Sequence, residues 1–340
     1  MKSIQDIISS TEYDFLRTNE HLKDKLMFLV FGGSHAYGTN TPASDVDIRG
    51  CAFNSKADLL GFGTFEQVVE ETTDTTVYGL NKLIKLLIDC NPNTIEMLGS
   101  KPEHYAIFSP AAQELFDNKS LFLSKKAAYS FGGYATAQLR RLQNAVARDT
   151  LTQSEKENHI LASIKRAMAT FNDRYERFDE GAIRIYTDKS NREGFDTEIF
   201  MDANLQKYPL RDYKTLWSEM NEVVKVYGNL NHRNQKKDDL HLNKHAMHLI
   251  RLYLMCLDIL EKSEIITYRE NDLDLLMGIR NGKYQKEDGT FYMEFFDMVT
   301  DYENHVKYAL ENTNLPEQPD LKRIEEFVIS INEKVVRGEY

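Results

Sequence analysis

Short apolar runs bounded by glycine characterise the first third of the chain. Residues 26–31, Leu-Met-Phe-Leu-Val-Phe, are apolar without interruption and end at two glycines, which predicts a buried β-strand. Residues 44–53 alternate enough to form a second strand, and residues 66–80 are rich in β-branched side chains, which favours one long bent strand or a hairpin. Residues 80–98 repeat apolar side chains at helical spacing and contain an Asn-Pro step, which predicts a helix that stops and then restarts.

From about residue 121 the pattern changes to long segments with apolar side chains at steps of three and four, as in amphipathic helices. The predicted helices span residues 124–149, 154–178, 240–262, 272–285 and 316–338. Residues 180–208 lack such a period, so we expect them to be irregular. The predicted fold class is therefore α+β: a small mixed-sheet domain over residues 1–118, followed by a mainly helical domain over residues 119–340.

The composition argues against a protein that coats nucleic acid and against one that spans a membrane. The 340 residues carry a formal net charge of -11, and proteins that coat nucleic acid usually have a basic balance, so only a local basic groove is expected. No apolar run approaches the ~20 residues of a membrane span, and the N-terminus lacks the apolar core of a signal peptide, so no membrane partner is expected. The scattered Cys51, Cys90 and Cys256 are typical of reduced thiols in the cytoplasm.

The first candidate chemistry lies where the first predicted strand ends. Gly32, Gly33 and Ser34 follow that strand directly. Glycines let a backbone approach a ligand closely, and free N–H groups at the start of a helix favour an anion such as a phosphate. The Ser34 hydroxyl adds a further donor. Gly-Gly-Ser is also an ordinary turn sequence, so this segment alone leaves both interpretations open.

A pair of aspartates follows the glycines. Asp45 and Asp47 are expected on one face of the second predicted strand, because strand side chains repeat every two residues. Two such carboxylates repel each other unless a cation lies between them or water solvates them. Hard oxygen ligands suit Mg²⁺, which also binds substrate phosphates. Asp-x-Asp pairs also occur on solvated strand faces, but together with the glycine turn, about a dozen residues away, they favour two-metal phosphoryl transfer.

The segment over residues 32–50, GGSHAYGTNTPASDVDIRG, resembles the nucleotidyltransferase signature of the DNA polymerase beta superfamily. Its Tyr-Gly-Thr and Ser-Asp-x-Asp-x-Arg-Gly elements are similar to a subgroup of predicted nucleotidyltransferases that are sometimes found beside RNA ligases. Residues 77–98, 243–260 and 272–284 also resemble helical segments of that subgroup. The resemblance therefore covers most of the chain.

The resemblance implies nucleotidyl transfer with two metal ions in a polymerase-beta-like palm domain. Asp45 and Asp47 would hold two Mg²⁺ ions, with Mn²⁺ as an alternative. The superfamily needs a third carboxylate that ligates one metal and helps to activate the attacking hydroxyl. The preferred candidate is Asp74, which precedes the helix as the acid of the subgroup does. Glu70 and Glu71 are rivals, and each of these acids is alternatively a solvated side chain on a strand.

The substrate would be a nucleoside triphosphate (NTP) such as ATP. The resemblance implies that Gly33, Ser34 and Ser44 hold its triphosphate, and that cations from a later helix neutralise the outer phosphates. The candidate clamp, which shares one helix face at steps of four and three, consists of Lys244, His248 and Arg251. A solvated stripe on an amphipathic helix is the alternative interpretation of this clamp.

Several other residues are further candidates for the site, and most of them allow two interpretations. His241, His245 and His248 have a spacing that could present imidazoles to Zn²⁺, although surface or groove histidines are the simpler interpretation. Tyr37 either stacks on a base or packs beneath the turn. Arg49 is expected to pair with a carboxylate near the site. Basic residues that either line the cleft or are merely solvated are Arg140, Arg141, Lys165 and Arg166.

Three functions follow from this sequence. The first is transfer of a nucleoside monophosphate from an NTP to an acceptor hydroxyl with release of pyrophosphate. The acceptor would be an RNA or tRNA 3′ end, in line with the resemblance and with the basic patch at residues 231–237. The second is the same transfer to a small molecule or to a protein. The third is a catalytically inert nucleotide-binding or antitoxin-like module, which would not need the Asp-x-Asp pair.

Overall fold

The computed structural model describes residues 3–150, 152–167, 183–191, 196–205, 207–231, 239–287 and 289–340. The chain divides into two compact units. We call the first the sheet unit; it comprises Met1–Gln138, Ala246–Tyr284 and Met293–Tyr340. We call the second the hairpin unit; it comprises Leu139–His245 and Gln285–Tyr292.

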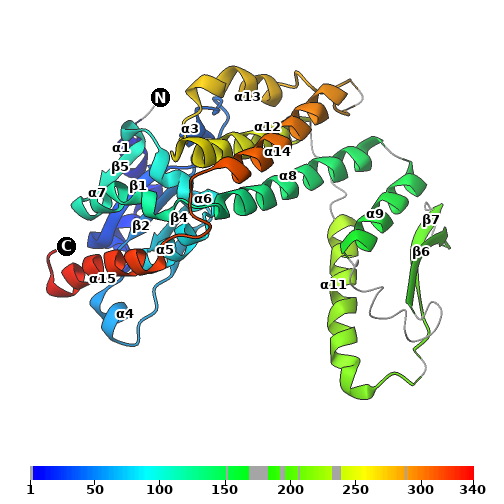
Figure 1. Ribbon diagram of the computed structural model, residues 1–340, viewed down its shortest axis with the longest axis horizontal. Helices are drawn as coiled ribbons and strands as arrows, with labels where there is room; N and C mark the ends of the chain where they lie inside the picture. The colour runs from blue at the N-terminus through cyan, green and yellow to red at the C-terminus, as the bar shows by residue number, and fades with distance from the viewer. Residues whose placement is uncertain are drawn as a thin grey trace. The chain divides into compact units, whose positions relative to one another are not determined.

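A mixed sheet of five strands forms the centre of the sheet unit (Figure 1). Its strands, in the order β3-β4-β2-β1-β5, are β3 Gln67–Glu70, β4 Thr75–Gly79, β2 Ile48–Ala52, β1 Leu26–Phe31 and β5 Tyr105–Phe108. β1 is antiparallel to both β2 and β5, β2 is parallel to β4, and β3 and β4 form an antiparallel hairpin. These findings confirm the predicted α+β class, the predicted first strand and the hairpin alternative for residues 66–80.

The register of β2 and β4 positions two aspartates side by side. Ile48 lies opposite Thr75 in this parallel pair, so Asp47 and Asp74 each occupy the position directly before their strand. The backbone N–H of Ile48 donates to the Asp74 carbonyl at 3.3 Å. Because neighbouring strands lie about 4.8 Å apart, the two aspartates enter the sheet as neighbours.

The second strand is shorter than predicted. β2 begins at Ile48, opposite Phe31 at the end of β1, and beyond Phe31 the chain turns away. The residues before Ile48 therefore have no strand partner there, although the N–H of Gly32 donates to the Asp47 carbonyl at 2.8 Å. Asp45 and Asp47 precede the strand, so strand alternation does not place them on one face.

Helices cover the sheet. α5 packs against β2 and β4, α7 packs against β1, and α1 packs against β5. α15 contacts α4 and α5. The bounds are α1 Ile4–Ile8, α2 Phe15–Thr18, α3 Gly33–Tyr37, α4 Lys56–Leu60, α5 Leu80–Ile88, α6 Pro92–Ile95, α7 Pro110–Asp117, α13 Leu273–Arg280, α14 Met293–Asn312 and α15 Leu321–Arg337. Two long helices, α8 Lys126–Thr150 and α12 Asp239–Leu257, run from one unit into the other.

The predicted stop and restart of the helix over residues 80–98 is confirmed. α5 ends at Ile88, and α6 begins at Pro92, where a proline at the first helical position has no N–H to satisfy. The Asn91 side chain caps α6 by accepting from the N–H of Asn93. A 3-10 turn over Glu96–Gly99 follows directly, and it brings Glu96 into the interior of the unit.

The hairpin unit contains strands that the sequence analysis missed. β6 Ile183–Lys189 and β7 Thr197–Ala203 form an antiparallel pair, α9 Gln153–Ala167 packs on both strands, and α11 Tyr213–Asn231 contacts α9. Residues 180–208 were expected to be irregular, but alternating β-branched side chains such as Ile183, Ile185 and Ile199 face the core of this unit. The predicted helix over residues 154–178 is described up to Ala167, and its remainder lies outside the described residues.

The compact units do not follow the predicted division at residue 118. α13, α14 and α15 join the sheet unit, where the Thr267 hydroxyl donates to the Glu96 carbonyl at 2.5 Å. The functional boundary between a catalytic domain over residues 1–118 and a substrate-binding domain over residues 119–340 stays a prediction. Among the described residues, every helix is too short or too polar to span a bilayer.

Candidate active site

The glycine turn brings the backbone against a carboxylate. Gly33 has a φ of 53°, a left-handed conformation that favours glycine. A Cβ atom at this position would lie 1.9 Å from Oδ2 of Asp47, far inside any van der Waals contact. The turn therefore depends on glycine both for its conformation and for the space that the Asp47 carboxylate occupies.

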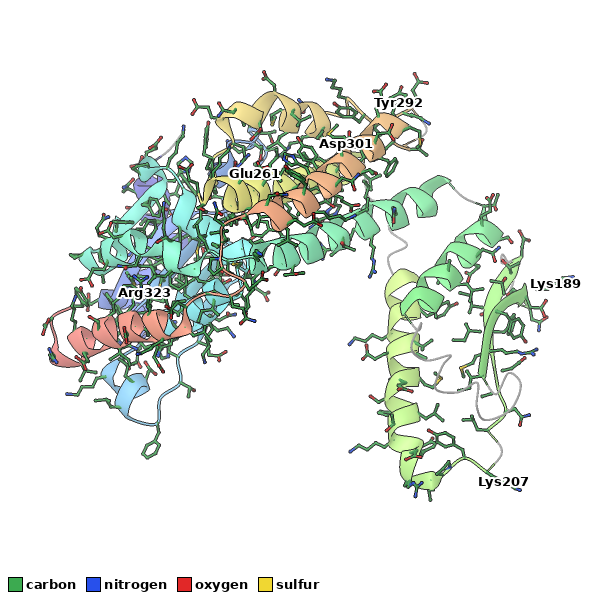
Figure 2. All side chains as sticks on the ribbon, in the orientation of Figure 1. Lys189, Lys207, Glu261, Tyr292, Asp301 and Arg323 are labelled. Carbon is green, nitrogen blue, oxygen red and sulfur yellow. The ribbon has the colours of Figure 1, made fainter. Side chains whose placement is uncertain are left out.

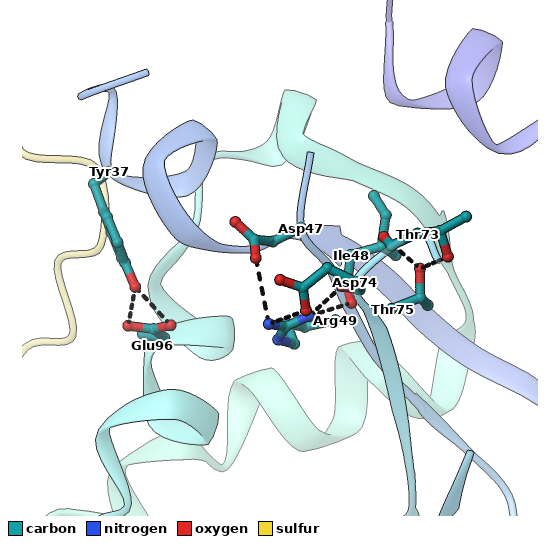
Figure 3. A network of polar contacts seen from close by, with 8 residues as sticks. All are labelled: Tyr37, Asp47, Ile48, Arg49, Thr73, Asp74, Thr75 and Glu96. Carbon is teal, nitrogen blue, oxygen red and sulfur yellow. Dashed lines mark hydrogen bonds and ion pairs between the residues drawn. The ribbon is translucent and has the colours of Figure 1, made fainter. Parts of the chain in front are cut away.

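Arg49 joins the two aspartates that precede β2 and β4 (Figure 3). Its Nη2 lies 3.4 Å from Oδ1 of Asp47 and 3.0 Å from Oδ1 of Asp74. Its Nη1 donates to the Asp74 backbone carbonyl at 2.5 Å. The Asp47 side chain is 21% exposed and that of Asp74 is 60% exposed. The prediction that Arg49 pairs with a carboxylate is thus confirmed: one positive charge pairs with two carboxylates, and that of Asp47 lies against Gly33.

The local chain explains the place of Asp74. The β3–β4 hairpin is closed by residues 71–74, and Asp74 takes a φ of 42°, which aspartate tolerates better than most residues do. Glu70 lies on β3, which pairs with β4 on the side away from β2. The Glu70 carboxylate accepts from the Thr72 hydroxyl at 2.7 Å, and Glu71 is exposed. Of the three candidate third acids, Asp74 is therefore the one beside Asp47.

The donor set at this point fits a divalent cation in its chemistry. Asp47 and Asp74 supply hard oxygen atoms, and both carboxylates lie within 3.4 Å of the same positively charged nitrogen. Among the described residues, however, no group of three or more Asp, Glu, His or Cys side chains is drawn together as a metal centre would require. The structure thus brings Asp47 and Asp74 together around Arg49, while Asp45 is exposed on the preceding loop.

A residue that the sequence analysis did not single out holds this loop. Arg280, the last residue of α13, donates from Nη1 to the Thr39 carbonyl at 2.6 Å and from Nη2 to the Ser44 hydroxyl at 3.2 Å. The Ser44 hydroxyl also accepts from the N–H of Thr41 at 2.8 Å. Ser44 thus shapes the loop that precedes Asp45. The segment around Arg280 carried a family resemblance, but no spacing in it pointed to this particular side chain.

Beneath the turn lies a buried polar network. The Tyr37 hydroxyl donates to both carboxylate oxygens of Glu96 at 2.9 Å, and Nη1 of Arg251 donates to Oε2 of Glu96 at 3.2 Å. The Arg251 guanidinium stacks 3.8 Å from the centre of the Tyr37 ring. All three side chains are buried, and burial raises the pKa of Glu96, an effect that the nearby Arg251 charge opposes. Tyr37 therefore packs beneath the turn, as one of its two predicted alternatives required.

The predicted phosphate clamp stays a prediction, because its members fall in both compact units: Lys244 belongs to the hairpin unit, and His248 and Arg251 belong to the sheet unit. Arg251 is buried against Glu96 and Tyr37, so its charge already has a partner. His248 is half-buried, with its ring edge-on to Tyr37 at 6.2 Å, and Lys244 is exposed in the hairpin unit. Helical spacing could not reveal this partner of Arg251, because Glu96 lies far away in the sequence.

The remaining basic and histidine candidates lie in the hairpin unit. Arg140 and Arg141 are exposed on α8, and His245 is partly exposed on α12. The side chains of His241, Lys165 and Arg166, and most of the basic patch at residues 231–237, lie outside the described residues. In the part of the chain that the structure describes, no histidine cluster suited to Zn²⁺ is present.

Replacing Glu96 with glutamine is expected to destabilise the sheet unit by about 3 kcal/mol or more, because it leaves the buried Arg251 charge without its partner. Urea unfolding measures this change. The matched control is Glu270→Gln, which removes the exposed partner of Lys101 and should change stability by less than about 1 kcal/mol. Equal unfolding midpoints for the two variants would show that the buried pair does not stabilise the fold.

The segment that carries this geometry is similar to known proteins. Residues 7–169, which contain the glycine turn, Asp47 and Asp74, match the model of a family described as the RNA repair pathway DNA polymerase beta family. An uncharacterized 38.9 kDa protein in the nrdC-mobD intergenic region of enterobacteria phage T4 is 22% identical over 330 residues, which cover 89% of this chain and 96% of that relative. No solved structure matches the chain.

Proposed function

We propose that this chain, whose residues 7–169 match the RNA repair pathway DNA polymerase beta family, transfers a nucleoside monophosphate from an NTP to an acceptor hydroxyl. The observation that carries the proposal is the pairing of Asp47 and Asp74 with one positive charge, with the Asp47 carboxylate directly against Gly33. A carboxylate pair next to a glycine turn suits metal-assisted phosphoryl transfer.

Asp47 and Asp74 are the residues proposed to hold Mg²⁺ or Mn²⁺, and Asp45 is the proposed third ligand from the adjoining loop. Bound metal ions would neutralise the charge that develops on the entering and leaving oxygens. Arg49 neutralises Asp47 and Asp74 in the metal-free chain and so reduces their mutual repulsion. The parallel register of β2 and β4 keeps the two carboxylates adjacent, which is the arrangement that a shared cation requires.

The other proposed roles at the site concern binding of the triphosphate and activation of the attacking hydroxyl. Gly33 has no side chain, which leaves room for the Asp47 carboxylate, and its backbone is the proposed contact of the triphosphate. Ser34, the next residue, is the proposed additional donor to that triphosphate. Asp74 is the more exposed of the two paired acids, and it is the proposed acceptor of the proton from the attacking hydroxyl.

An RNA or tRNA 3′ end is the proposed acceptor. Support comes from the family description, which places its members in RNA repair, rather than from the charge of the chain, which is -11. A small molecule or a protein hydroxyl is the alternative acceptor. A catalytically inert nucleotide-binding or antitoxin-like module finds no support in the site, because binding alone does not require paired acids beside Gly33.

Incubation with each NTP labelled at the α-phosphate tests both the reaction and the acceptor. In the presence of Mg²⁺ and a mixture of total RNA, protein and small metabolites, the RNA fraction should acquire label from at least one NTP. Label in protein or metabolites would support nucleotidyl transfer but show that the acceptor is not RNA. If no fraction acquires label from any NTP with Mg²⁺ or Mn²⁺, the proposed activity is wrong.

A further inference from the structure

Arg280 carries a half-buried charge at the loop between the glycine turn and Asp45. Its two described hydrogen bonds go to neutral acceptors, the Thr39 carbonyl and the Ser44 hydroxyl. Burial lowers the pKa of this guanidinium, which is the direction expected for a cation that leaves water without gaining an acid. The Thr39 hydroxyl is itself buried and has no hydrogen-bond partner in the described part of the chain.

The three other arginines of the sheet unit that are buried or partly buried all form ion pairs with acid partners. Arg49 pairs with Asp47 and Asp74, Arg251 pairs with Glu96, and Arg269 pairs with Asp258 and Asp272. Arg280 forms no ion pair within the described ranges. A partly buried charge without a counter-charge is unfavourable, so such a residue beside a reactive centre points to a charge supplied by a ligand.

The position of Arg280 selects the ligand. Thr39 and Ser44 lie at the two ends of the loop that connects α3 with Asp45, so the guanidinium contacts both ends of the segment between the proposed phosphate turn and the proposed metal ligands. A guanidinium holds its N–H donors in a fixed, planar fork. Arg280 uses one N–H of each terminal nitrogen on the loop, and its other N–H groups can donate to two oxygens of one phosphate. RNA backbones are ordinarily bound by rows of exposed cations, whereas Arg280 is a single, half-buried one.

We propose that Arg280 binds the outer phosphates of the NTP, in the role that the sequence analysis gave to Lys244, His248 and Arg251. This inference rests on the proposed function and names a binding residue for its triphosphate. The same side chain also binds Thr39 and Ser44. Phosphate binding by Arg280 would therefore be coupled to the conformation of the loop that precedes Asp45.

Equilibrium binding tests this role without turnover. An α,β-methylene NTP analogue, which cannot be cleaved between its α- and β-phosphorus atoms, is titrated into wild type, Arg280→Gln and Arg280→Lys, and so is the nucleoside monophosphate. Arg280→Gln should weaken binding of the analogue by about tenfold or more, while binding of the monophosphate stays the same. Arg280→Lys, which keeps the charge, should recover part of the loss. Arg323→Gln, an exposed arginine on α15 (Figure 2), should bind both ligands as wild type does.

The outcomes separate this inference from the proposed function. Equal weakening of the analogue and the monophosphate by Arg280→Gln would show a merely structural role for the arginine and overturn the inference. Weakened binding of a single-stranded RNA oligonucleotide, with unchanged binding of the analogue, would overturn it as well. If wild type transfers label but Arg280→Gln binds the analogue as wild type does, the inference about Arg280 is wrong and the proposed function still holds. Wild type that binds no NTP analogue contradicts both.

Discussion

Gly33→Ala is expected to lower the rate of nucleotidyl transfer at least about a hundredfold in a chain that still folds. The new methyl group would fall 1.9 Å from Oδ2 of Asp47, so either that carboxylate or the turn must move. Alanine also disfavours the φ of 53° at this position, at a cost of about 1–2 kcal/mol. A displacement of about 1 Å at a reacting centre can lower a rate roughly a hundredfold, so we expect the rate of label transfer to fall at least that far.

Gly132→Ala is the matched control for this substitution. Gly132 lies in α8, where an added Cβ meets no atom within 4 Å, and alanine is the better helix former there. Transfer rates should therefore be unchanged in Gly132→Ala, and circular dichroism should show both variants folded. A folded Gly33→Ala variant that transfers label at the wild-type rate would show that the contact between the turn and Asp47 has no part in the reaction.

Asp74→Asn is expected to lower transfer on the order of a thousandfold, since a ligated metal supplies several kcal/mol of transition-state stabilisation that an amide cannot support. The substitution keeps the shape of the side chain and leaves the bond from Arg49 to the residue 74 carbonyl in place. Its loss of activity therefore reports the missing charge rather than a rearranged hairpin. The rate of label transfer under saturating Mg²⁺ is the measurement.

Glu70→Gln and Glu71→Gln are the comparison for Asp74→Asn. Both acids belong to the same hairpin, but Glu70 pairs on the far side of β4 and Glu71 lies in the turn. We expect either variant to retain activity within about threefold of wild type, since surface substitutions away from the reacting groups have small effects and neither side chain is buried. Should Glu70→Gln or Glu71→Gln lose more activity than Asp74→Asn, the third carboxylate has been assigned to the wrong residue.

Local patterns in the sequence were sufficient to predict much of the secondary structure of the sheet unit. The apolar run over residues 26–31 coincides with β1, and β-branched residues 66–80 form the β3–β4 hairpin, because both patterns follow from neighbours along the chain. The Asn-Pro step that separates α5 from α6 is local in the same sense. The partner of Arg49 was also expected, since its acids lie close by in the motif and in the hairpin.

Long-range partners explain what the sequence could not reveal. Arg251 is separated from Glu96 by 155 residues, and Arg280 is separated from Thr39 by 241 residues. Helical spacing correctly placed Arg251 and His248 on one helix, but it carried no information about a buried carboxylate from a distant 3-10 turn. The early end of strand pairing at Ile48 likewise depends on where β1 turns away, so the alternation rule failed for Asp45.

Release of pyrophosphate from an NTP tests most directly whether the acids beside Gly33 form a reactive centre. Wild type should release pyrophosphate only when a divalent cation is present, and Asp47→Asn should release it on the order of a thousandfold more slowly. Arg323→Gln, with its exposed side chain on α15, should match wild type. Pyrophosphate release at the wild-type rate by a folded Asp47→Asn variant would contradict the account.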